Sequence, residues 1–134
     1  MSPIETVRYI YAAFGRGDVP AILACLADEV EWEYGQPSNP APWLQQRRGR
    51  AAVPGFFDVL LSNVEFHRFE PRRQLADGLL VVGLVDFEAT VRKTGRKVIE
   101  VDEVHLFHFN EAGQVLRFAH RADTLQHANA WLGS

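Results

Sequence analysis

Apolar and polar residues alternate most clearly in the second half of the chain. Apolar residues at every second position are followed by polar ones: Val85, Phe87, Ala89 and Val91 against Asp86, Glu88, Thr90 and Arg92. Successive side chains of a strand point to opposite faces of a sheet. The pattern therefore predicts a long strand over residues 79–92, with the apolar set facing the interior and the polar set facing out.

Two more strands are predicted over residues 97–109 and 114–122, joined by a turn at Asn110–Gly113. The phenylalanines indicate the inner face of each strand. For the first strand this face would carry Ile99, Val101, Glu103, His105, Phe107 and Phe109, and for the second it would carry Leu116, Phe118, His120 and Ala122.

The length of that turn sets the expected register between the two strands. If it is a regular four-residue connection, Glu103 lies opposite His120 and His105 lies opposite Phe118 on the inner face. On the outer face, Asp102 would then lie opposite Arg121, and Leu106 opposite Arg117.

The first half of the chain has helical spacing instead. A capping box of Ser2 and Glu5 begins a helix, and Gly15–Gly17 end it. Asp18 caps a second helix that runs to about Leu26.

A third helix is predicted over residues 51–61, and a half-buried strand over residues 30–34. In that strand Trp32 and Tyr34 would face inward, and Glu33 would face out. Helices followed by a run of long strands are typical of an α+β fold.

Glu103, His105 and His120 are the strongest candidates for chemistry. A carboxylate directly opposite an imidazole raises the pKa of the imidazole and fixes its tautomer. We expect His120 to act as a general base whose pKa lies near the ordinary value of about 6.5, shifted by its neighbours. Two other interpretations remain open: a satisfied buried polar network, and polar ligand binding without chemistry. A register shifted by one residue would bring Asp102 and His108 inward instead.

A set of two histidines and a glutamate also suits zinc or iron. The sequence holds no compact metal-ligand motif, so we predict neither a metal nor a cofactor. The two remaining candidate histidines, His67 and His127, are expected at the surface.

Composition narrows the class of protein. The 134 residues fit one domain over 1–134, and 47% of them are hydrophobic, enough for a core. The net charge of −3 argues against a nucleic-acid or membrane surface. No apolar run approaches the roughly 18 residues that span a bilayer, and no signal peptide is evident. We therefore expect a cytoplasmic protein.

The sequence also resembles a known family. The segment Tyr11-Ala-Ala-Phe-Gly-Arg-Gly-Asp18, the segment Leu26-Ala-Asp-Glu-Val-Glu-Trp32 and the run Val104-His-Leu-Phe-His-Phe109 are similar to the nuclear transport factor 2-like superfamily. The closer resemblance is to its SnoaL-like polyketide cyclase and ketosteroid isomerase-like branch. This implies a cone: a curved mixed sheet wrapped around three N-terminal helices, with a deep apolar cavity. It also implies a homodimer through the outer sheet face, which here carries Val104, Leu106, Arg117 and Arg121.

The resemblance also implies site positions. The three steroid isomerase positions hold Ile10, Tyr34 and His105 here, so that triad is not retained. The histidine of SnoaL-type cyclases matches His105, and His120 or Asp123 stands near their aspartate.

Together these observations predict a protein that binds a small, mostly apolar molecule. Its activity would be that of a cofactor-free isomerase, cyclase or hydratase acting on a carbonyl compound. The alternatives are a non-catalytic binder or sensor and a dimeric interaction module. The predicted catalytic residues are Glu103, His105, His120 and Tyr34. The predicted pocket residues are Tyr11, Trp32, Trp43, Phe57, Phe87, Phe107, Phe118 and Asp123.

Overall fold

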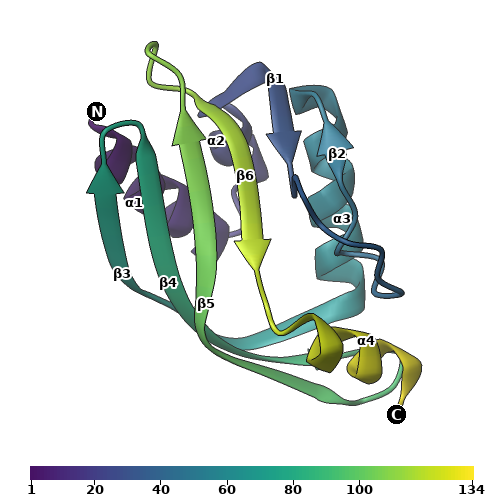
Figure 1. Ribbon diagram of the computed structural model, residues 1–134. Helices are drawn as coiled ribbons and strands as arrows, with labels where there is room; N and C mark the ends of the chain where they lie inside the picture. Colours follow the sequence, from purple (N-terminus) through teal and green to yellow (C-terminus); the bar gives the residue numbers. More distant parts are fainter.

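The alternating segments of the second half form the body of one six-stranded sheet in the order β2-β1-β6-β5-β4-β3 (Figure 1). The structure is a computed structural model that describes all residues from 1 to 134. Only the pair β1–β6 is parallel. The strands are β1 (Leu26–Trp32), β2 (Arg47–Arg48), β3 (Val64–Asp77), β4 (Leu80–Val91), β5 (Lys97–Phe109) and β6 (Val115–Arg121).

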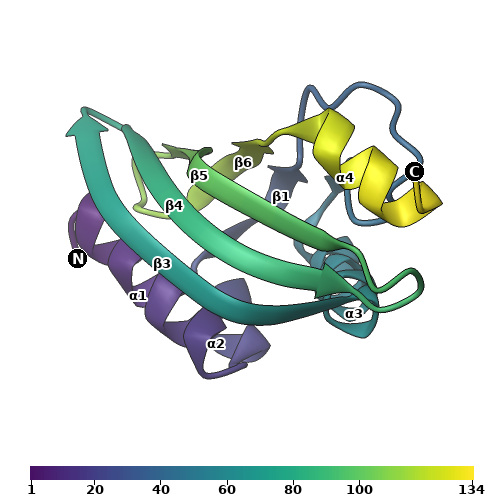
Figure 2. The same cartoon turned by 90° about the horizontal axis from the view of Figure 1, so that it is seen from below.

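The helices lie mainly on one side of this curved sheet, as Figure 2 shows. They are α1 (Pro3–Gly15), α2 (Val19–Leu23), a short 3₁₀ turn (Arg50–Ala52), α3 (Val53–Asn63) and α4 (Thr124–Leu132). α1, α2 and α3 cover the concave face, and the main hydrophobic core lies between them and the sheet. The predicted α+β cone around three N-terminal helices is confirmed, with a fourth helix at the C-terminus.

α4 extends the wall of the cone where β6 has ended. It lies beside the first half of β5: Gln126 donates to the carbonyl of Ile99 and accepts from its backbone N–H, at 2.9 and 2.7 Å. The loop after β1 reaches the same end, where Asn39 donates to the carbonyl of Thr124 at 3.1 Å. These contacts hold α4 against β5 and against the loop that follows β1.

The register between β5 and β6 differs from the prediction by two residues. His105 lies opposite His120, so the predicted facing pairs Glu103–His120 and His105–Phe118 are both wrong. The turn is longer than expected, because the backbone N–H of Asn110 donates to the carbonyl of Gln114, and an irregularity follows at His108/Phe109.

Each side chain keeps its predicted face of the sheet despite this shift, because side-chain direction in a strand repeats every two residues. Glu103, His105 and His120 all face inward, and each is less than 10% exposed. On the outer face, the predicted pairs of Asp102 with Arg121 and Leu106 with Arg117 are wrong: Arg121 lies opposite Val104, and Leu106 opposite Ala119.

A bulge in β5 at Asp102 corrects the predicted inner face of this strand. Asp102 has a left-handed φ of 55°, so both Glu100 and Glu103 point inward on either side of it. Before the bulge the alternation is inverted, and Ile99 and Val101 are 50% and 71% exposed.

Asp86 fills the space at this bulge. Its Oδ1 accepts from the backbone N–H of Asp102 at 2.9 Å, and its Oδ2 pairs with Arg72 at 2.9 Å. These two partners hold the pKa of the Asp86 carboxyl below its usual range. Asp86 is therefore covered, although the alternation predicts an outward residue.

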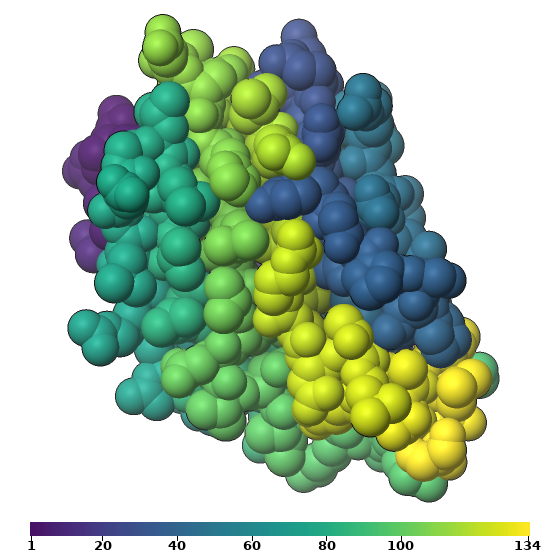
Figure 3. All heavy atoms as spheres, in the orientation of Figure 1, coloured from purple at the N-terminus to yellow at the C-terminus, as the bar shows by residue number.

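The outer face of the sheet is seen in Figure 3, where β3 to β6 lie side by side. Val104 and Leu106 are half-buried there, with Arg117 on the same face. The predicted homodimer through this face stays a prediction. None of the helices combines the length and the apolar character that a membrane-spanning helix needs.

The bulge generates a stability prediction. A left-handed backbone costs a non-glycine residue about 1–2 kcal/mol, and glycine avoids this cost. We expect Asp102→Gly to raise the free energy of unfolding by up to about 1 kcal/mol in urea titrations. The matched change Val101→Gly, at an exposed extended position, should lower it by about 0.5–1 kcal/mol. Equal losses in the two variants would contradict a left-handed Asp102.

Candidate functional site

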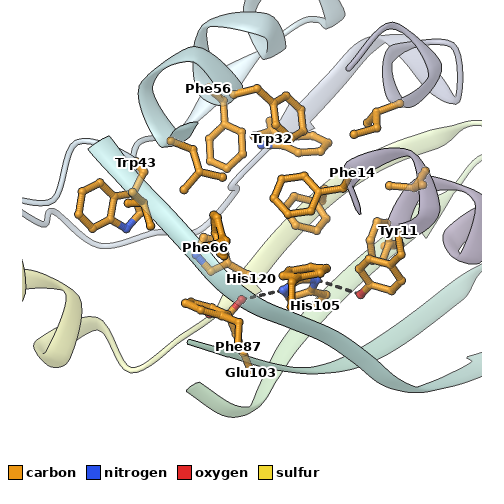
Figure 4. A pocket seen from close by; sticks show the side chains of 18 of the residues that line it. Tyr11, Phe14, Trp32, Trp43, Phe56, Phe66, Phe87, Glu103, His105 and His120 are labelled. Atoms are coloured by element: carbon orange, nitrogen blue, oxygen red, sulfur yellow. Dashed lines mark hydrogen bonds and ion pairs between the residues drawn. The ribbon is translucent and has the colours of Figure 1, made fainter. Parts of the chain in front are cut away.

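A cavity of ≈ 90 Å³ lies between the helices and the concave face of the sheet. Sixteen of its twenty lining residues are hydrophobic, so its few polar groups are conspicuous. Figure 4 shows the aromatic side chains that surround it. Seven of the eight predicted pocket residues line it: Tyr11, Trp32, Trp43, Phe57, Phe87, Phe107 and Phe118. Its charged or titratable lining residues, apart from Tyr11, are Glu103, His105, His120 and His127.

Tyr11, His105 and Glu103 form a hydrogen-bonded chain on one wall (Figure 4). The Tyr11 hydroxyl lies 2.9 Å from Nδ1 of His105, and Nε2 of His105 lies 2.7 Å from Oε1 of Glu103. Burial, and secondarily the Glu103 carboxylate, raise the pKa of Tyr11 well above its usual range. The phenol therefore stays protonated and can donate to His105.

Glycine at position 83 makes room for this chain. Gly83 lies directly opposite His105 on β4, and a Cβ built there would overlap the Tyr11 hydroxyl. The same Cβ would lie 3.2 Å from Cζ of the tyrosine ring, a far milder contact. The Tyr11 hydroxyl thus occupies the space that a Cβ at position 83 would fill.

His120 is paired with Glu33, a residue that the alternation places outside. Glu33 is fully buried, and its Oε1 accepts from the backbone N–H of His120 at 2.9 Å. Its Oε2 forms an ion pair with Nδ1 of the same histidine. Glu33 reaches inward because its φ is 59°, which breaks the alternation at the end of β1.

This pairing sets the charge of His120. Burial alone lowers the pKa of the imidazole, but the carboxylates of Glu33 and Glu103 outweigh burial and raise the pKa to about 9. His120 is therefore protonated at neutral pH. A carboxylate raises its pKa, as the sequence predicts, but the main one is Glu33 and not Glu103. Its second ring nitrogen, Nε2, makes no hydrogen bond within the chain.

Glu103 keeps one free oxygen. Burial raises the pKa of its carboxyl, but the charge of His120 and the hydrogen bond from His105 lower it overall. Glu103 is therefore ionised, and its Oε2 is buried with no hydrogen-bond partner. Trp32 lines the same cavity, and its Nε1–H is also buried without a partner.

His127 forms a third buried pair, although the sequence analysis places it at the surface. It is 3% exposed on the inner side of α4, and its Nε2 lies 2.8 Å from Oε2 of Glu100. Trp43 donates its Nε1–H to Nδ1 of His127 at 2.9 Å. Because an indole can only donate, Nδ1 must accept, and His127 is a neutral imidazole with its proton on Nε2.

Two predicted site residues lie elsewhere. Tyr34 follows the left-handed Glu33 and points to the outer face, where its hydroxyl lies 2.7 Å from Nε2 of His108 and the guanidinium of Arg117 lies 4.2 Å from the ring centroid. Burial and the charge of Arg117 lower the pKa of His108. Asp123 is the N-cap of α4 and accepts from the backbone N–H of Gln126 at 3.2 Å, outside the cavity.

A metal ion fits this site poorly. Ligand atoms of Glu100, Glu103 and His127 lie within 4.8 Å of one another. A metal on Nε2 of His127 would move the imidazole proton to Nδ1, which would then face the N–H of Trp43. Two donors pointing at each other disfavour that arrangement.

Fold and cavity together define a class: an α+β cone with an aromatic interior and histidine–carboxylate pairs on one wall. Residues 7–118 match the model of the SnoaL-like domain. The chain belongs to the SnoaL-like domain family, as the resemblance predicts.

Solved structures agree with this assignment. A nuclear transport factor 2-like protein of unknown function from Burkholderia pseudomallei is 28% identical, with a TM-score of 0.84 over 97% of this chain and 98% of that chain. A nuclear transport factor 2-like protein from Burkholderia xenovorans is 27% identical, with a TM-score of 0.83 over 96% and 94%.

A proposed polyketide cyclase from Pseudomonas putida shares the fold at 19% identity, with a TM-score of 0.77 over 97% of this chain and 98% of that chain. No curated protein matches the sequence.

The fit between Gly83 and Tyr11 is testable with a double-mutant cycle. Gly83→Ala should lower the free energy of unfolding by about 1–3 kcal/mol, because overpacking displaces the hydroxyl. Tyr11→Phe removes that hydroxyl, so Gly83→Ala in the Tyr11→Phe background should cost at least about 1 kcal/mol less. Urea unfolding of the four proteins measures the coupling. Losses that add within about 0.5 kcal/mol would show that the two residues are independent.

Proposed function

We propose that the chain binds a small, mostly apolar carbonyl compound in this cavity and catalyses a proton shift on it without a cofactor, as an isomerase or cyclase. One observation carries the proposal. The ionised Glu103, with an unpartnered oxygen, and the protonated His120, with an unpartnered nitrogen, line the same mostly apolar cavity. A base and an acid in a water-poor site suit enolisation.

The roles of the residues follow from their protonation. Glu103 Oε2 takes a proton from the carbon next to the carbonyl, and the C–H electron pair becomes the C=C bond of an enolate. The carbonyl electron pair moves onto oxygen, where Nε2–H of His120 donates a hydrogen bond to the developing charge. Return of the proton to another carbon gives an isomer. Attack of the enolate carbon on a second carbonyl of the substrate instead forms a ring: the π electron pair of that carbonyl moves onto its oxygen, which takes the proton from Glu103.

This assignment revises the expectation that His120 is the base. A histidine that is already protonated at neutral pH cannot accept a proton, whereas it is a strong hydrogen-bond donor. His105 becomes a positioning residue, because its Nε2 holds Oε1 of Glu103 and leaves Oε2 free. Membership of the SnoaL-like family, and the shared fold of a proposed polyketide cyclase, support this class of reaction.

A non-catalytic binding protein is the second candidate. The dominance of hydrophobic side chains in the cavity wall favours it, because apolar contact alone can supply affinity. The two candidates differ in whether the bound molecule exchanges protons.

Proton exchange gives a direct test that does not require the natural substrate. Small apolar ketones are incubated with the protein in D₂O, and loss of their α-protons is followed by ¹H NMR. Glu103→Gln should slow the exchange by about 10²–10⁴-fold, the usual contribution of a general base.

The matched control for this test is Glu31→Gln, a carboxylate of β1 that pairs with Arg48 at 3.2 Å on the outer face. It should leave the exchange rate unchanged. If wild-type protein binds the ketones but never exchanges their protons, the binding-protein candidate replaces the enzyme.

The pH dependence of the exchange follows from the two pKa shifts. The rate should rise with pH as Glu103 ionises, below the ordinary carboxyl range, and should fall again as His120 loses its proton near pH 9. Glu33→Gln removes a main cause of the raised pKa of His120, so the upper limb of the profile should move to lower pH. An upper limb that does not move in Glu33→Gln would rule out His120 as the acid.

A further inference from the structure

The hydrogen bonds of the cavity wall leave very few polar atoms for a ligand. Both oxygens of Glu33 face His120, and Oε2 of Glu100 accepts from His127 and from the backbone N–H of Asp123. Both nitrogens of His105 and both nitrogens of His127 are engaged within the chain.

Among the residues that line the cavity, three groups remain without a hydrogen-bond partner. Two are donors, Nε2–H of the protonated His120 and Nε1–H of Trp32, and one is an acceptor, Oε2 of Glu103; the Trp32 and Glu103 atoms are fully buried. Buried polar atoms without partners destabilise a protein, and a ligand that pairs with them recovers that loss. The complementary ligand therefore has at least two acceptor oxygens and one donor hydrogen.

The charge of the cavity wall further restricts the class of ligand. Glu33, Glu100 and Glu103 are each at most 5% exposed, and no lysine or arginine lines the cavity. His127 is neutral because it accepts from Trp43, and a neutral His105 satisfies both Tyr11 and Glu103. Of the three carboxylates only Glu103 lines the cavity, while Glu33 is paired with His120 and Glu100 with His127. The unpartnered oxygen of the ionised Glu103 therefore opposes any anionic ligand.

We infer that the cavity selects neutral hydroxy-carbonyl compounds and rejects carboxylates. The carbonyl oxygen accepts from His120, the hydroxyl hydrogen is donated to Glu103, and an oxygen of the ligand reaches Trp32. The inference rests on the proposed function, since it names the substrate class of the same site. The volume of ≈ 90 Å³ suits a small molecule, and the aromatic lining suits an apolar body.

Three probes that share one phenyl ketone body test the inference: acetophenone, 2-hydroxyacetophenone and phenylglyoxylate. They carry a methyl, a hydroxymethyl and a carboxylate group beside the same carbonyl. Isothermal titration calorimetry at pH 7 gives the dissociation constant of each. We expect 2-hydroxyacetophenone to bind about tenfold or more tightly than phenylglyoxylate, and also more tightly than acetophenone, because it alone gives Glu103 a donor without adding charge.

Glu103→Gln tests the cause of this order. The amide carries no charge, so the gap between 2-hydroxyacetophenone and phenylglyoxylate should shrink, whereas Glu31→Gln on the outer face should keep it. If Glu103→Gln does not fold, the order of the three dissociation constants measured with wild-type protein still tests the inference.

The inference is overturned if phenylglyoxylate binds as tightly as 2-hydroxyacetophenone, if acetophenone does, or if 2-hydroxyacetophenone shows no binding. These outcomes are separate from the fate of the proposed function. If the three probes bind in the expected order but no ketone exchanges its α-protons, catalysis is rejected and the ligand class is retained. If ketones exchange their α-protons but the order of affinities is inverted, the ligand class is rejected and catalysis is retained.

Discussion

The pairing of three buried carboxylates with three histidines is the constraint on which the rest of the interior depends. Glu33, Glu100 and Glu103 lie in an apolar cone, where an unpaired charge costs several kcal/mol. Each carboxylate contacts its own imidazole, and the six residues come from β5, β6, α4 and the end of β1. The pairs therefore tie together segments that are far apart in the sequence. Removing one partner would strand a charge, at a cost of about 3–5 kcal/mol.

Two left-handed residues make this pairing possible. Regular alternation would direct Glu33 away from the interior, and it would put Glu100 and Glu103 on opposite faces of β5. The positive φ angles of Glu33 and Asp102 bring the additional carboxylates inside. Such conformations cost a non-glycine residue about 1–2 kcal/mol each. Strained backbone of this kind gathers at functional sites, and here both strained residues adjoin the polar wall.

The sequence predicts the fold and the aromatic lining well, and half of the polar wall. A strand repeats every two residues, so an error of two residues in the register keeps Glu103, His105 and His120 on the predicted face. The sequence does not predict that Glu33 and Glu100 point inward, because nothing in it marks a glutamate or an aspartate for positive φ. The prediction that Tyr34 points inward is wrong for the same reason, because the left-handed Glu33 turns the next side chain to the outer face.

The three pairs have the same composition, but their surroundings give them different chemistry. Trp43 is hydrogen-bonded to the second nitrogen of His127, and Tyr11 to that of His105. Neither imidazole therefore has a nitrogen left to bind a ligand. Only His120 keeps a free nitrogen, and Glu33 serves as its counter-ion. Had Glu103 been the partner of His120, the acid and the base would have neutralised each other in one ion pair. Because Glu33 takes that role, Glu103 keeps an unpartnered oxygen beside a charged donor, and the proposed acid and the proposed base remain separate across the same cavity.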